Sequence, residues 1–264
     1  MARVHAPQYH ETLFSHIYPG KQDSGPTYIP ILEALEPCLG LTAAQKQRSV
    51  LRSDAGFGGD ANVNHALKAG WQVLAKGKGG RRPQAYARQV VADDWQALQA
   101  GRWVARASAP PAYACPTQHL VLRWQTETRL IKYSTVVCSV MVWTPVEIIA
   151  GYDDRGACET EIQADKAGLK LERRRKKRLD AQEALILLTD VAHNLLAWTP
   201  QWMFPSQPLA KFGATRLTED VLSLPGRLLF SGERLVEVQL NQRHPYAAEV
   251  AAGLERLLSH FGYP

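Results

Sequence analysis

Hydrophobic and polar positions follow a strand period at the start of the chain. Residues 2–18 alternate β-branched, aromatic and polar side chains and end at a Pro-Gly turn, which predicts a strand or a hairpin arm. Residues 47–53 and 71–77 are predicted strands on either side of the helical segment ANVNHALKAG. Because the connections between these three elements are short, the pattern predicts a parallel pair of strands.

Farther along, the pattern becomes β-rich and then helical. A helix is expected over residues 84–97, and the segments RWVARAS, HLVLRWQTE and RLIKYSTVVCSVMVW then predict antiparallel strands. Residues 180–198 are apolar almost all round a helical circumference, so we expect this helix to be buried against a sheet. Residues 227–240 predict a hairpin that turns at a Ser-Gly pair, and residues 246–260 predict an amphipathic helix.

A capping box marks the start of another helix at Thr144. A proline follows at the first helical position, and Glu147 lies three residues after the threonine. We expect one continuous helix from there to Gly168, a residue type that often ends helices. Gly151 and Gly156 lie inside this span and cost about 1 kcal/mol each relative to alanine.

Four polar side chains share one face of this predicted helix. At about 100° per residue, Arg155, Glu159 and Lys166 fall near −60°, −20° and −40° from Tyr152. A solvated face with spaced ion pairs has the same appearance, so two interpretations stay open, an ordinary exposed face and a functional site. The two internal glycines and the basic run that follows favour the functional site.

The excess positive charge of the chain is concentrated in one segment. The chain has 264 residues, enough for one or two domains with a sizeable core, and a net charge of +6. The stretch from Lys170 to Arg178 holds seven Lys or Arg and one Glu, a net +6, so it carries the whole excess. A solvated surface run is one interpretation and a polyanion partner is the other; the adjoining polar stripe favours the polyanion.

Cysteine usage and hydropathy exclude other classes. The cysteines are widely spaced without a CxxC pair, which argues against a zinc ribbon or a disulfide scaffold. No segment resembles a signal peptide or an apolar span of 18 residues, so we expect a cytoplasmic protein.

The spacing Tyr, two residues, Arg, three residues, Glu, six residues, Lys resembles the signature of a branch of DDE-class transposases from bacterial insertion sequences. The segment RSDAGFGGDANVNHALKAGWQVLAKG resembles the one that carries their second catalytic aspartate, which would be Asp54. Residues 171–198 resemble their basic turn and long buried helix. The resemblance covers roughly residues 4–198 in consistent order.

The resemblance implies an α/β fold with an RNase H-like mixed sheet, flanking helices and a β-rich insertion subdomain. Residues 1–77 would form the first part of the catalytic core, residues 78–144 the insertion, and residues 145–264 the second part of the core with the C-terminal region. In the family, a strand with the first catalytic aspartate lies upstream, and no motif here matches it. We therefore expect an N-terminally truncated copy, without detectable magnesium-dependent nicking by this chain alone.

The resemblance also implies two-metal phosphoryl transfer that cuts and joins transposon and target DNA. Asp54 and Glu159 would hold two Mg²⁺ or Mn²⁺ ions. The residues alone favour a turn or N-cap role for Asp54, although Asp60 fits the cap role better. Tyr152 would offer a hydroxyl donor to the terminal phosphates of the element.

Positive side chains complete the implied DNA contacts. Arg155 and Lys166 would bind the same terminal phosphates as a charged fork and a point charge. The basic run would position the DNA backbone without reading its sequence. Its residues are Arg173, Arg174, Arg175, Lys176, Lys177 and Arg178. Double-stranded DNA is therefore the expected partner, and a homodimer is expected in the active state.

Two other functions stay open at this level. A DNA-binding remnant without catalysis would bind duplexes with steep salt dependence and show no metal-dependent cutting. Another RNase H-like nuclease, such as a junction or repair enzyme, would prefer branched DNA over element ends.

Overall fold

A computed structural model describes residues 2–19, 22–99, 101–108, 111–154, 156–174, 176–205 and 207–262. The chain divides into two compact units. The sheet unit consists of residues 18–156, and the hairpin-helix unit consists of residues 3–17 and 157–264.

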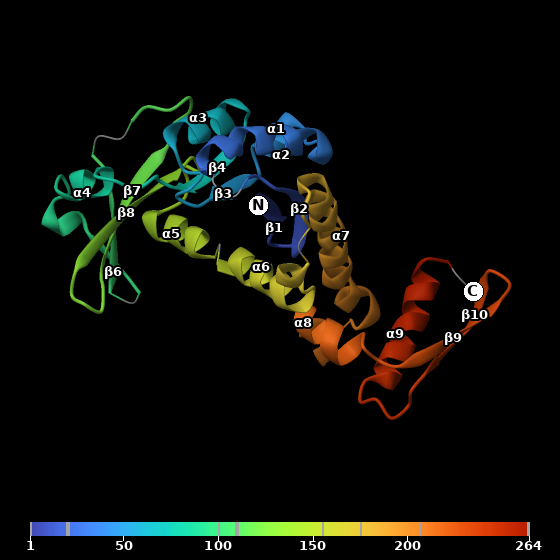
Figure 1. Cartoon of the computed structure of the whole chain (residues 1–264). Helices are drawn as coiled ribbons and strands as arrows, with labels where there is room; N and C mark the ends of the chain where they lie inside the picture. Colours follow the sequence, from blue (N-terminus) through green and yellow to red (C-terminus); the bar gives the residue numbers. More distant parts are fainter. Residues whose placement is uncertain are drawn as a thin grey trace. The chain divides into compact units, whose positions relative to one another are not determined.

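The sheet unit is built on one six-stranded mixed sheet, ordered β3-β4-β8-β7-β6-β5 (Figure 1). β3 and β4 are parallel, as predicted, and the other neighbours are antiparallel. The strands are β3 (Val50–Ser53), β4 (Gln72–Lys76), β5 (Gln96–Leu98), β6 (Arg102–Arg106), β7 (Gln118–Gln125) and β8 (Ile131–Cys138). The helices are α1 (Tyr28–Leu39), α2 (Ala43–Lys46), α3 (Asp60–Lys68), α4 (Arg82–Ala87) and α5 (Pro145–Asp153).

Strand alternation assigns a different helix to each face of this sheet. Leu74 and Leu120 point to the face that α5 covers with Ile148, and these side chains are fully buried. Val121 points to the opposite face, where it packs with Tyr86 of α4. The mixed α/β architecture with flanking helices that the resemblance implied is confirmed. β5–β8 extend the sheet that β3 and β4 begin, while the predicted boundaries after residues 77 and 144 stay predictions.

A buried histidine makes the sheet unit sensitive to acid. His119 on β7 bonds the Thr117 hydroxyl at 3.0 Å and stacks on Tyr113 at 5.2 Å between ring centroids. Burial lowers the pKa of His119 from its ordinary 6.5 to about 4, against the charge of Asp60. His119 therefore takes up a proton at a higher pH in the unfolded chain than in the folded one. Its titration leaves the free energy of unfolding unchanged above pH 6.5 and lowers it as the pH falls from 6.5 towards 4.

We expect about 2 kcal/mol of this loss to be specific to His119, because solvent and neighbouring charges screen the full shift. Urea unfolding at pH 7 and pH 4.5 measures it, since the His119→Gln variant should lose less stability on acidification. His65→Gln, in a half-buried position, is the matched control and should behave as the unchanged protein. Equal acid sensitivity in all three proteins would contradict the assignment.

The hairpin-helix unit packs its helices around the long helix α7. Its strands are β1 (Ala2–Ala6), β2 (Glu11–His16), β9 (Gly226–Ser231) and β10 (Arg234–Leu240). Its helices are α6 (Gly156–Gly168), α7 (Leu179–Met203), α8 (Ala214–Arg216) and α9 (Ala247–His260). α7 contacts β2 and α9, and Phe204 and Leu217 are buried in the core that α7 shares with α9. The hairpin predicted at 227–240 and the helix predicted at 246–260 are confirmed. The strand or hairpin arm predicted over residues 2–18 is two paired strands, β1 and β2, with a turn at residues 7–10 between them.

Short helical turns join these elements. They are 3₁₀ turns at Gly25–Thr27, Ala92–Asp94, Leu171–Arg173 and Pro208–Lys211, and a π turn at Leu217–Val221.

The single helix predicted from Thr144 to Gly168 is wrong, because α5 ends at Asp153 and α6 begins at Gly156. Two aspartates at the break form ion pairs with arginines of the sheet. The Asp153 carboxylate accepts from Arg102 at 2.6 and 3.2 Å, and Asp154 accepts from Arg52 at 3.0 Å. Aspartate and glycine have low helix propensity, so little helix stability is lost when the helix ends at these two aspartates.

Two further helix predictions need correction. The helix expected from residue 84 onward ends at Ala87, and the strand β5 follows it within ten residues. α7 is not buried all round, because β2 and α9 cover only part of its circumference. Ile186 and Leu196 are buried, whereas Leu188 is 67% exposed and Val191 58% exposed.

Candidate functional site

Asp54 lies immediately after the parallel strand β3, at the edge of the sheet where ligands bind in many α/β folds. Its carboxyl group is held by the loop that follows. Oδ1 accepts the backbone N–H groups of Gly56 at 2.9 Å and Phe57 at 3.3 Å. Among the described residues, Oδ2 has no hydrogen-bond or ion-pair partner, and the residue is exposed. The loop therefore orients the carboxylate and leaves one oxygen for a ligand.

The Asp54 loop is pressed against β4, and this requires a glycine. The Asp54 carbonyl accepts the N–H of Gly58 at 2.9 Å, and the Gly58 carbonyl accepts the N–H of Lys78 at 3.2 Å. A Cβ atom on Gly58 would lie 1.7 Å from the Lys76 carbonyl oxygen. Only glycine allows the two backbones to approach this closely.

Asp60 has a structural role that distinguishes it from Asp54. Both of its oxygens accept from the Arg82 guanidinium at 2.7 Å, and Oδ1 also accepts from the Tyr113 hydroxyl. The Arg82 hydrogen bonds are the main cause that lowers the pKa of the Asp60 carboxyl group, although burial opposes them. Gly59, not Asp60, is the N-cap of α3, so the cap role predicted for Asp60 is wrong.

The residues of the predicted stripe that the structure describes lie on two helices. Tyr152 lies on α5 in the sheet unit, and Lys166 lies half-buried on α6 in the hairpin-helix unit. Glu159 is on α6, but its side chain lies outside the described part of the chain, as does all of Arg155. The shared site of Asp54 and Glu159 therefore stays a prediction.

Tyr152 is largely buried in the core of the sheet unit, at 9% exposure. It also lines a surface pocket of about 250 Å³ together with the cationic side chains Lys76 and Arg102. Trp124 forms another part of the pocket wall. Asp153 also lines the pocket and pairs with Arg102 at 2.6 Å, so the wall carries charges of both signs.

The basic run is open to solvent wherever the structure describes it. The exposed residues are Arg173, Arg174, Lys176, Lys177 and Arg178, while Arg175 lies outside the described residues. Arg178 pairs with Asp180, the second residue of α7, at 2.5 Å. The other described cations of the run have no side-chain acid partner among the described residues, so their charge is free for a polyanion.

A buried charge network in the hairpin-helix unit was not predicted. Arg3 of β1 donates to Asp165 of α6 at 2.5 Å and to Asp190 of α7 at 2.7 Å. Asp165 is fully buried, and its other oxygen bonds His193 Nδ1 at 2.6 Å. The network thus ties β1, α6 and α7 together. Burial is the main cause that raises the pKa of Asp190, because Arg3 and Ser15 offset it only in part.

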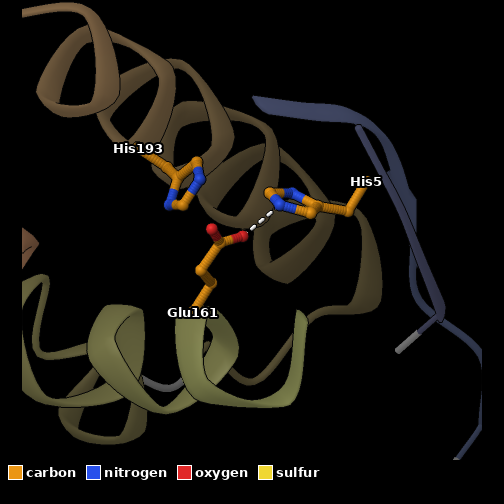
Figure 2. Close-up of side chains that lie close together, drawn as sticks. All are labelled: His5, Glu161 and His193. Atoms are coloured by element: carbon orange, nitrogen blue, oxygen red, sulfur yellow. Dashed lines mark ion pairs between the residues drawn. The ribbon is translucent and has the colours of Figure 1, made fainter. Parts of the chain in front are cut away.

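Three histidines surround this network. Burial would lower the pKa of His193, but the hydrogen bond and charge of Asp165 outweigh it and raise that pKa above its ordinary value. Burial lowers the pKa of His5, although its contact with Glu161 opposes the shift. His10 is exposed, and its Nδ1 lies 2.5 Å from Glu161 Oε1. Figure 2 shows His5, Glu161 and His193 directed toward one another from three elements.

Comparison of the sequence with protein-family models gives a match over most of the chain. A family model described as the transposase DDE domain, group 1, matches residues 7–260. A search of curated proteins found no match. Of the helices in the described residues, none has the length and apolar character needed to cross a membrane.

Proposed function

Because the chain belongs to the family of transposase DDE domains, group 1, we propose that it is a catalytic domain that cuts and joins transposon DNA by phosphoryl transfer. We assign it to the branch with the Tyr-Arg-Glu-Lys signature, and Asp54 and Glu159 to the divalent ions that the family uses. The observation that carries this assignment is the exposed carboxylate of Asp54, which is oriented by its loop at the end of a parallel strand.

The donor set at Asp54 suits Mg²⁺ or Mn²⁺. Hard divalent cations prefer carboxylate oxygens and keep several waters, so one free oxygen from each of a few acids is sufficient. Asp54 offers such an oxygen, whereas Arg82 occupies both oxygens of Asp60. When bound, the ions would activate the attacking water or 3′-hydroxyl and stabilise the leaving oxygen.

The protein's own side chains would hold the DNA. Arg155, Lys166 and Tyr152 are assigned to the terminal phosphates, as a charged fork, a point charge and a hydroxyl donor. The exposed basic run would track the DNA backbone and add affinity without sequence preference. Joining two element ends requires two active sites, so we infer a homodimer in the active state.

The DNA-binding part of the proposal predicts a change in salt dependence. Replacing Arg173, Arg174, Lys176 and Lys177 by glutamine should weaken duplex binding. The slope of log K against log salt should fall by about 0.9 for each phosphate that the variant no longer neutralises, because fewer counterions are released. Fluorescence anisotropy with a labelled duplex, repeated over a range of salt concentrations, measures this slope.

A matched control removes the same charge elsewhere. Replacing Arg129, Lys132, Arg227 and Arg234, which are all exposed, by glutamine also removes four positive charges, but from two hairpins. This variant should keep the original slope within about one unit. Equal changes of slope in both variants would indicate nonspecific attraction to a basic protein and would count against the proposed interface.

A further inference from the structure

A cluster of nitrogen and oxygen ligands lies in the hairpin-helix unit, in a different unit from Asp54. We propose that His5 of β1, Glu161 of α6 and His193 of α7 bind one divalent transition-metal ion of the Zn²⁺ class. One ligand atom from each residue lies within 4.8 Å of the others. The side chains of His5 and His193 are only 3% and 7% exposed. This proposal does not depend on the DNA chemistry.

His193 is already oriented as a metal ligand would be. Its Nδ1 bonds the fully buried carboxylate of Asp165 at 2.6 Å. A histidine that ligates a metal through one ring nitrogen usually donates its other N–H to a carboxylate, which fixes the ring and increases its basicity. Arg3 holds Asp165 in turn, at 2.5 Å. The orienting carboxylate is therefore itself fixed by a buried ion pair.

The ring nitrogens of the cluster face acceptor oxygens, so each of these contacts needs either a proton or a metal ion. With Nδ1 donating to Asp165, His193 Nε2 faces the His10 carbonyl oxygen at 2.9 Å, and a carbonyl cannot donate a hydrogen. His5 Nε2 faces the Glu161 carboxylate as well. Either added protons or a metal ion would reconcile these contacts. Protons would satisfy the His5 contact and the His193 contact separately, one on each Nε2. A single metal ion would bind His5, Glu161 and His193 together.

The donor types select the metal. Two imidazoles and one carboxylate form a set typical of Zn²⁺, Co²⁺ and related ions, and Mg²⁺ prefers oxygen ligands. Zn–N bonds are about 2.0–2.1 Å, so the ligand atoms must adjust to admit the ion. His5 and Glu161, which are now in direct contact, must separate, and His193 must approach them. A bound ion would link β1, α6 and α7. Because Glu159 lies two residues before Glu161 on α6, the ion would also fix the helix that carries Glu159.

Cobalt spectroscopy tests this site directly. The full chain is stripped with a chelator, its thiols are alkylated, and Co²⁺ is added. Alkylation prevents Cys38 and Cys115, both exposed, from binding the metal. We expect one equivalent of Co²⁺ with visible absorption bands typical of low-coordinate cobalt. We also expect displacement by one equivalent of Zn²⁺, resistance to millimolar Mg²⁺ and a rise in Tm on metal addition.

Variants separate the proposed ligands from other histidines. His5→Ala and Glu161→Gln should each weaken Co²⁺ binding at least tenfold. His16→Ala, which removes a partly exposed histidine paired with Glu183, should leave it unchanged. Glu161→Gln preserves side-chain volume, so it remains informative if His5→Ala folds poorly. A chain that binds less than a tenth of an equivalent, or bound cobalt that both ligand variants retain at full affinity, would overturn the proposal and leave a network held by protons.

Discussion

Replacing Asp165 by alanine should lower the free energy of unfolding of the chain by about 3–5 kcal/mol. The carboxylate is fully buried and accepts from both Arg3 and His193. Its removal leaves a guanidinium with 3% side-chain exposure and only one of its two acid partners. Breaking a buried ion pair from one side is costly, because the remaining charge is neither solvated nor fully paired. Urea unfolding in the presence of a chelator measures the loss without any contribution from metal.

Asp220→Ala is the matched control. Asp220 forms an i,i+4 pair with Arg216 on the surface of the same unit, at 3.1 Å. Exposed pairs contribute little, so this variant should lose less than about 1 kcal/mol. If the two variants lost the same stability, the three-element network would not be a main source of stability in this unit.

Gly58→Ala should destabilise the sheet unit by about 3 kcal/mol and displace the Asp54 loop. The new Cβ would lie 1.7 Å from the Lys76 carbonyl oxygen and 2.8 Å from its carbon, and backbone atoms of a buried strand cannot rotate away. The loop must therefore lift from β4. The hydrogen bonds that orient the Asp54 carboxylate should weaken with it.

Gly59→Ala supplies the comparison one residue later. No atom lies within 4 Å of a Cβ at this position, and its φ of −71° suits any residue. We expect a loss below about 1 kcal/mol, from the poorer N-cap alone. Thermal unfolding of both variants measures the difference. A Gly58→Ala protein as stable as Gly59→Ala would show that the close approach to β4 is not required.

The elements that depend on residues close together in the sequence were predicted correctly. The strand-helix-strand order around residues 50–76 was sufficient for the parallel pair. The capping box at Thr144 was predicted because its two partners are three residues apart, and both of its hydrogen bonds form. The β9–β10 hairpin turns at Gly232, whose φ is +62°. Glycine is the residue that adopts a positive φ most easily, so the Ser-Gly pair predicted this turn from the sequence.

The errors and omissions have long-range causes. Arg102 pairs with Asp153, the last residue of α5, and Arg52 pairs with its C-cap Asp154, from 51 and 102 positions away in the sequence. Arg3 and Asp165 are 162 residues apart, so no spacing rule could pair them. The sequence signal for the network was a group of polar residues, Asp190 and His193 among them, within an otherwise apolar helix.

Iron-directed cleavage of the protein tests most directly whether Asp54 and Glu159 hold the same metal ions. Fe²⁺ replaces the bound cation and, with ascorbate and peroxide, cuts the backbone beside its ligands. The Glu161→Gln background keeps iron out of the histidine cluster. We predict paired cuts near residues 54 and 159, both suppressed by Mn²⁺ and both abolished in Asp54→Asn. A cut at only one of these places, or a cut near residue 159 that survives Asp54→Asn, would contradict the shared metal site.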